Sequence, residues 1–80
     1  MKTITIRVTA DDIKFGLHAD VDSCPIARAM GRATGKRWRV SRNYLWHRHL
    51  EIKTPVAVRR WIRIFDHYLK VKPFTFKVRI

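Results

Sequence analysis

Residues that build cross-links, phosphate loops and membrane spans are scarce in this chain. A single cysteine, Cys24, among 80 residues allows no disulfide within the chain and implies no oxidising compartment. Three scattered glycines form no glycine-rich phosphate loop. The longest apolar runs are well short of the ~20 residues that cross a bilayer, and residues 1–10 lack the apolar core of a signal peptide. A cytoplasmic location without a membrane partner is therefore expected.

Acidic residues are scarce as well. The chain has six Asp and Glu residues and 18 Lys and Arg residues, which gives a formal net charge of +12. Residues 24–80 hold 15 of the basic residues and only two acidic ones, so nearly all of the excess lies there. Arginine outnumbers lysine, and its planar guanidinium suits phosphate better than an ammonium does. This balance predicts a polyanionic partner, with nucleic acid as the leading candidate.

Hydrophobic patterning predicts one α+β domain over residues 1–80. Strands are expected at residues 3–9, 36–41, 44–53 and 74–80. Helices are expected at residues 24–34 and from Pro55 onward, and a short helical turn is expected at residues 10–16. This is the element order of the ferredoxin-like βαββαβ fold. That fold is an antiparallel four-stranded sheet with two helices on one face, so its other face would be open to solvent.

Helix boundaries carry recognisable markers. Asp22 or Ser23 is expected to cap the helix at residues 24–34, and Gly35 to end it. Thr54 is expected to cap the last helix, with Pro55 in its first position. An apolar stripe at helical spacing runs along that last helix: Val58, Trp61, Ile62, Phe65 and Leu69. Helix capping is the expected role of Asp22, and solvation is the expected role of Asp11, Asp12 and Asp20.

The open sheet face is the first candidate binding surface. Because successive side chains of a strand point to opposite faces, this face would carry five basic side chains: Arg7, Arg37, Arg39, Lys77 and Arg79. Thr3, Thr5 and Thr75 would lie beside them. A flat basic surface suits phosphate contacts, and the alternative is an ordinary solvated polar face.

The last helix carries the second candidate, formed by Arg59, Arg60 and Arg63. Arg63 lies three and four residues after the other two, so all three are neighbours on the helix surface. Like charges this close repel one another unless an anion lies between them. The alternative is an ordinary basic helix face.

The third candidate is the segment from Arg37 to His49, in which basic and aromatic residues alternate. Its members are Arg37, Trp38, Arg39, Arg42, Tyr44, Trp46, His47, Arg48 and His49. Single-stranded nucleic-acid sites combine stacking rings with basic groups in this way. The alternative is that the aromatic side chains belong to the core. The paired aromatics of the RNA-recognition motif are absent from the first strand, which offers Thr and Arg instead.

Chemistry beyond binding has little support in the sequence. His47 and His49 are expected to share one side of a strand, but the sequence marks no third ligand beside them, so no metal site is predicted. Cys24 precedes a helix without a base marked by spacing, and a buried structural thiol is the expected role. We therefore expect a protein that is not an enzyme and that has no cofactor, whose histidines could make binding depend on pH.

Several motifs resemble those of a family of small phage-encoded accessory proteins. They are the turn Ile13-Lys14-Phe15-Gly16, the helix start Cys24-Pro25-Ile26-Ala27, the helix end Phe65-Asp66 and the strand Pro73-Phe74-Thr75-Phe76. The resemblance implies a phage or prophage origin, hence the cytoplasm of a host cell, and an accessory role. It assigns no site residue.

Together these features predict a non-enzymatic phage accessory protein that binds DNA or RNA mainly through Arg and Lys contacts to phosphates. The candidate nucleic-acid-binding residues are Arg37, Arg39, Arg42, Arg48, Arg59, Arg60, Arg63, Lys77 and Arg79. The alternative is an anti-host or anti-defence (anti-CRISPR-like) inhibitor that binds an acidic or nucleic-acid-binding host protein. Both a monomer and a homodimer are compatible with the sequence.

Overall fold

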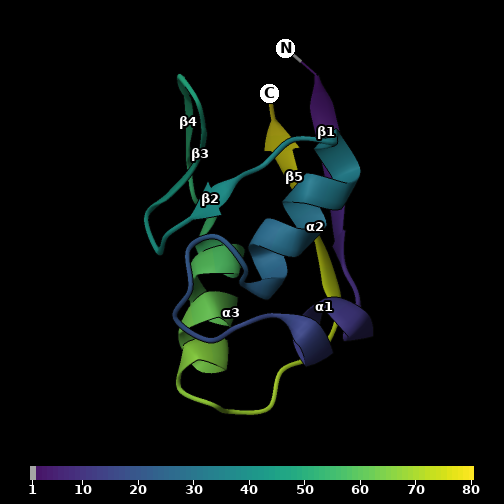
Figure 1. Ribbon diagram of the computed structural model, residues 1–80, viewed down its shortest axis with the longest axis vertical. Coiled ribbons are helices and arrows are strands. Elements are labelled where there is room, and N and C mark those ends of the chain that lie inside the picture. The colour runs from purple at the N-terminus through teal and green to yellow at the C-terminus, as the bar shows by residue number, and fades with distance from the viewer. Residues whose placement is uncertain (1) are drawn as a thin grey trace.

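The computed structural model describes residues 2–80, so Met1 of the expected domain lies outside the described residues. Its elements, in chain order, are β1 (Thr3–Val8), α1 (Ala10–Phe15), α2 (Pro25–Thr34), β2 (Arg39–Val40), β3 (Tyr44–His47), β4 (Leu50–Lys53), α3 (Val56–Asp66) and β5 (Phe74–Arg79) (Figure 1). The expected α+β class is confirmed. Within residues 2–80, no helix is long and apolar enough to cross a membrane.

The strands form two sheets, so the expected single four-stranded sheet of a ferredoxin-like domain is wrong. β1 pairs antiparallel with β5, from Thr3 opposite Arg79 to Val8 opposite Phe74. β2, β3 and β4 form a separate antiparallel sheet in that order. Its strands have only two or four residues each, because β2 is shorter than expected and the chain turns within the strand expected at residues 44–53.

The expected strand at residues 44–53 is a hairpin. The chain reverses at Arg48 and His49, and Arg48 has a left-handed φ of 53°. Leu45 therefore lies opposite Ile52, and Trp46 lies opposite Glu51. The reversal places Ile52 on the inner side with Leu45.

Two of the helix caps differ from the sequence prediction. Cys24, rather than Asp22 or Ser23, caps α2, and its Sγ accepts a hydrogen bond from the backbone N–H of Ala27 at 3.4 Å. Thr54 does not cap α3. Its buried hydroxyl donates to the carbonyl oxygen of Ser41 at 3.2 Å, and α3 begins after Pro55 without a side-chain cap. Gly35 ends α2 as predicted, with a φ of 70°.

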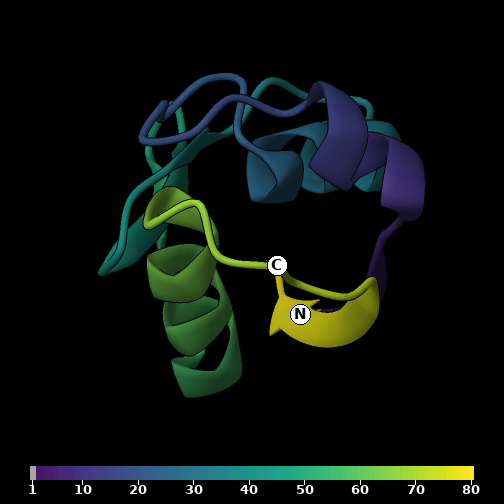
Figure 2. The same ribbon diagram turned by 90° about the horizontal axis from the view of Figure 1, so that it is seen from below.

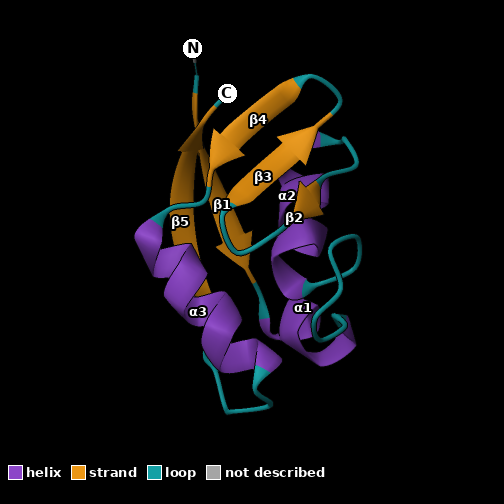
Figure 3. Ribbon diagram, turned by 90° about the vertical axis from the view of Figure 1, so that its left-hand side faces the viewer, coloured by secondary structure: helices purple, strands orange, loops and turns teal. Residues whose placement is uncertain are grey.

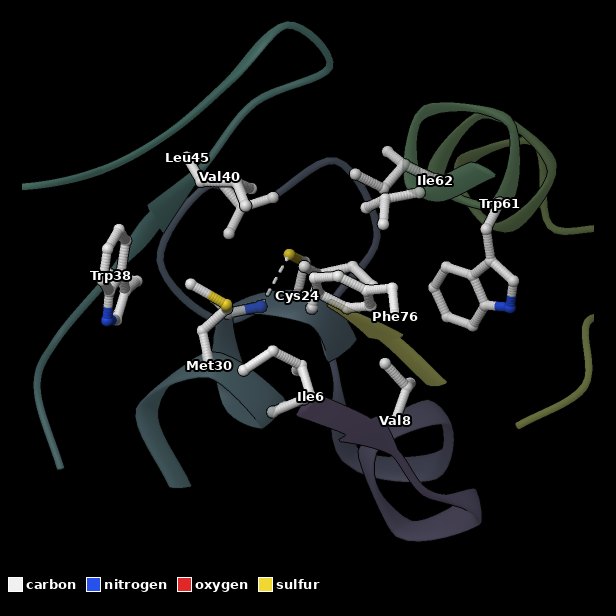
Figure 4. Close-up of a cluster of buried hydrophobic side chains, with 14 of the residues drawn as sticks. Ile6, Val8, Cys24, Met30, Trp38, Val40, Leu45, Trp61, Ile62 and Phe76 are labelled. Atoms are coloured by element: carbon white, nitrogen blue, oxygen red, sulfur yellow. Dashed lines mark hydrogen bonds between the residues drawn. The ribbon is translucent and has the colours of Figure 1, made fainter. Parts of the chain in front are cut away.

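One apolar core joins both sheets to α2 and α3. Seen along the long axis, these four parts surround a common centre (Figure 2). Buried side chains converge there from β1, α2, β2, β3, α3 and β5 and from the residues just before α2 and β2: Ile6, Val8, Cys24, Met30, Trp38, Val40, Leu45, Trp61, Ile62 and Phe76 (Figure 4). The predicted stripe of α3 is confirmed from Val58 to Phe65, but Leu69 is 61% exposed because α3 ends at Asp66.

Asp12 is buried in an ion-paired network, so the expectation that it is solvated is wrong. Its carboxylate accepts two hydrogen bonds from Arg32, at 2.8 and 2.7 Å. It also accepts from the backbone N–H of Thr9 at 2.9 Å, within a capping box at the start of α1. Nε of Arg28 lies 3.4 Å away. The network ties α1 to α2 and commits two of the arginines to structure.

This network makes stability depend on pH. Burial raises the pKa of Asp12, but the hydrogen bonds from Arg32 and Thr9 and the positive charge of Arg32 outweigh it and hold the pKa below its ordinary 3.8. A carboxylate whose pKa is lower in the folded state adds stability above its unfolded pKa, and loses that contribution as the pH falls through the folded value. Urea unfolding should therefore show a loss of stability below about pH 4 that is smaller in an Asp12→Asn variant. Equal losses in both proteins would contradict this role.

Candidate nucleic-acid interface

A large hollow lies between the end of α2, β2 and the tip of the β3–β4 hairpin. It has a volume of about 1030 Å³, and we call it the hairpin hollow. Its lining residues are Asp22, Gly35, Lys36, Arg37, Arg39, Trp46, His47, Arg48, His49 and Leu50. One acid among four Lys and Arg residues leaves this hollow strongly positive.

Local contacts hold the side chains of the hairpin hollow. The guanidinium of Arg39 lies over the ring of Trp46, 5.4 Å from its centroid, and its Nε lies 3.4 Å from a carboxylate oxygen of Asp22. Nδ1 of His47 lies 2.8 Å from the carbonyl oxygen of Arg37. The hollow thus combines a stacked aromatic ring, an oriented arginine and further cations.

His47 and His49 do not share one side of a strand as expected, because His49 lies in the hairpin turn. Both nevertheless line the hairpin hollow. Over residues 2–80, no group of three His, Cys, Asp or Glu side chains is arranged to hold a metal ion.

A second, smaller hollow is formed almost entirely by arginines. It has a volume of about 280 Å³ and is lined by Arg42, Val56, Arg59, Arg60 and Arg63, and we call it the arginine hollow. No acid lines it. The ion pairs found within residues 2–80 involve Arg28, Arg32 and Arg39 instead. Four like charges around one small space repel each other, and an anion between them would relieve that repulsion.

Arg42 reaches this hollow because the β2–β3 loop is fastened to the start of α3. The hydroxyl of Ser41 accepts hydrogen bonds from the backbone N–H groups of Asn43 and Tyr44, at 3.3 and 3.0 Å, and so closes the turn that holds Arg42. Thr54, just before α3, donates its backbone N–H to Asn43 at 2.8 Å and its hydroxyl to Ser41. The sequence placed Arg42 with the mixed basic and aromatic segment and missed its position beside the helix cluster.

The outer face of the β1–β5 sheet carries the remaining predicted basic residues. Threonines and basic residues lie opposite each other, as Thr3 with Arg79, Thr5 with Lys77 and Thr75 with Arg7, and all are exposed. Arg37 and Arg39 do not belong to this face, because Arg39 lies in the other sheet and Arg37 precedes it. The single basic face expected from the sequence is therefore divided between two sheets.

The aromatic residues of the mixed segment have separate roles. Trp38 is 2% exposed and its indole N–H donates to the hydroxyl of Thr34 at 2.8 Å, so it belongs to the core. Tyr44 is 43% exposed, and Trp46 is partly exposed at the hairpin hollow. Only these last two are available to a ligand.

Cys24 has a structural role. It is buried beneath the first turn of α2, and burial raises the pKa of its thiol more than the hydrogen bond from Ala27 lowers it. The thiol is therefore protonated at neutral pH and is a poor nucleophile.

Comparisons with known proteins leave the two hollows as the main evidence on function. The resemblance to phage accessory proteins stays a prediction. Neither a protein-family model nor a curated protein nor a solved structure matches this chain.

Proposed function

We propose that the protein binds nucleic acid, DNA or RNA, through contacts of Arg and Lys side chains with phosphates, without catalysing a reaction. The observation that carries this proposal is the arginine hollow, in which four guanidiniums surround a small space that no acid lines. Guanidinium groups pair with phosphate oxygens through two parallel hydrogen bonds. A volume of about 280 Å³ is large enough for a phosphate group.

The hairpin hollow offers further basic side chains to the same ligand. Arg37 and Arg39 line the hairpin hollow, and Arg42 lines the arginine hollow. Three residues of extended chain span about 10 Å, so Arg39 and Arg42 lie within a few nucleotides of each other on any bound strand. One nucleic-acid backbone can therefore reach both hollows.

Contacts of this kind predict affinity that depends strongly on salt and little on sequence. Each phosphate that the protein neutralises releases condensed counterions, so affinity falls as salt rises. For about 5–8 neutralised phosphates, the slope of log affinity against log salt would be about −4 to −7. Fluorescence anisotropy with labelled single-stranded and duplex oligonucleotides, over a range of salt concentrations, measures this slope. No binding at low salt would overturn the proposal.

An acidic or nucleic-acid-binding host protein is the second candidate partner, as for an anti-defence inhibitor encoded by a phage. It is favoured by exposed apolar side chains that phosphate binding would not use, namely Phe15, Leu17, Tyr68 and Leu69. These belong to α1 and the segments after α1 and α3, at the end of the long axis away from the hairpin (Figures 1 and 3). Parallel pull-downs from host lysate with and without nuclease separate the candidates, because a partner captured through nucleic acid is lost on nuclease treatment.

A further inference from the structure

We propose that the outer face of the three-stranded sheet stacks unpaired bases, so that the preferred ligand is a single strand. This inference rests on the proposed nucleic-acid binding and names its substrate class. The outer face consists of Arg39, Tyr44, Trp46, Glu51 and Lys53. Figure 3 shows the sheet that carries it at one end of the molecule.

The register of the sheet places these five side chains together. Residues directly opposite each other in antiparallel strands share a face. Trp46 lies opposite Arg39 on one side and Glu51 on the other, and Tyr44 lies opposite Lys53. The alternate positions point to the core: Val40 and Leu45 are buried, and Ile52 packs against them. Tyr44 and Trp46 are therefore directed outward by the same alternation that buries Leu45.

These outward aromatics contrast with the other tryptophans. Trp38 and Trp61 are buried, and their indole N–H groups donate to Thr34 and to the carbonyl oxygen of Lys72. Trp46 is only partly buried, and none of the hydrogen bonds found within residues 2–80 involves its indole. Large rings left at the surface of a small domain, two residues apart on one strand, are typical of a binding surface.

Cations border both rings, although the acid Glu51 lies opposite Trp46. Arg39 lies over Trp46, and the carboxylate of Asp22 holds that guanidinium at 3.4 Å. Lys53 lies opposite Tyr44, and Arg48 follows in the hairpin turn. Rings that stack bases, bordered by cations that contact the backbone, are the two parts of a site for single strands.

The stacking rings distinguish single strands from duplexes. In a duplex the base faces are covered by neighbouring pairs, so a flat sheet of rings cannot stack on them without unstacking the helix. A single strand offers both its phosphates and its base faces. Each stacked base should strengthen binding on the order of tenfold over the phosphate contacts alone.

The test compares two strands of equal charge. A labelled oligothymidylate of about 12 nucleotides and an abasic strand with the same number of phosphates are titrated with the full-length protein, and tryptophan fluorescence is followed in parallel. We expect the thymidine strand to bind at least about tenfold more tightly and to quench fluorescence, whereas the abasic strand does not. Trp46→Ala should reduce the difference between the two strands, and Tyr44 stacking accounts for the difference that remains.

Leu69→Ala, which truncates an exposed apolar residue at the far end of the molecule, is the matched control and should behave as wild type. Equal affinity of wild-type protein for the two strands would overturn the stacking platform and leave phosphate binding intact. Failure of both strands to bind at low salt would overturn the proposed function itself. The wild-type comparison stands even if the Trp46→Ala variant folds poorly.

Discussion

Asp12→Ala is expected to lower the free energy of unfolding by about 3 kcal/mol, a large fraction of the stability of a domain this small. The substitution removes both hydrogen bonds to Arg32 and the acceptor for the backbone N–H of Thr9, so the link between α1 and α2 and the capping box are lost together. Removing one partner of a buried pair costs about 3–5 kcal/mol. The lower end of this range applies because the side chain of Arg32 is half exposed and can rotate to become hydrated once Asp12 is removed. Urea unfolding at neutral pH, followed by circular dichroism, measures the change.

Two further variants make this result specific to the network. Asp11→Ala, next in sequence but exposed, should cost less than about 1 kcal/mol, since it removes only a charge at the start of a helix. Arg32→Ala should cost at least as much as Asp12→Ala, because it leaves a buried carboxylate with weaker partners. An Asp12→Ala protein within about 0.5 kcal/mol of wild type would show that the network adds nothing to stability.

The second large effect is on binding. The double variant Arg60→Glu, Arg63→Glu should weaken binding of any oligonucleotide on the order of 100-fold at 0.1 M salt, since two phosphate contacts become repulsive. Both side chains are exposed and are not among the ion pairs found within residues 2–80, so the fold should be retained. Anisotropy gives the affinity, and circular dichroism checks the fold.

The control for charge is the double variant Lys70→Glu, Lys72→Glu. It changes the net charge by the same amount at exposed positions of the α3–β5 segment, outside both hollows. Neither lysine lines a hollow, and exposed charges that do not contact the bound strand are partly screened at 0.1 M salt, so this variant should lose less than about threefold in affinity. Equal losses in the two double variants would mean that net charge alone governs binding and that the arginine hollow has no special role.

Features that depend on neighbouring residues in the chain were predicted well. Strands were expected at residues 3–9 and 74–80, and alternation along β1 and β5 buries Ile6, Val8, Phe76 and Val78. Gly35 was predicted to end α2 because glycine readily adopts the left-handed conformation found there. Such signals succeed because one residue and its near neighbours determine the local backbone energy.

Features that depend on distant residues were missed. Asp12 pairs with Arg32, which lies 20 positions later in the chain. No residue near Asp12 in the sequence indicates that partner. The reversal at Arg48 was missed because a left-handed residue other than glycine is uncommon. That single turn divided a predicted strand and decided which side chains of β3 and β4 face outward.

The sequence by itself determined the α+β class, the apolar stripes of the helices and the positive charge of residues 24–80, because composition and periodicity are properties of the chain alone. Only the tertiary structure decided which arginines act together. It committed Arg28 and Arg32 to a buried carboxylate, brought Arg42 beside α3 through the contacts of Thr54, and separated Trp38 in the core from Trp46 at the surface. The physical reason is that charge and stacking act across space, between residues whose separation in the sequence does not indicate that they meet.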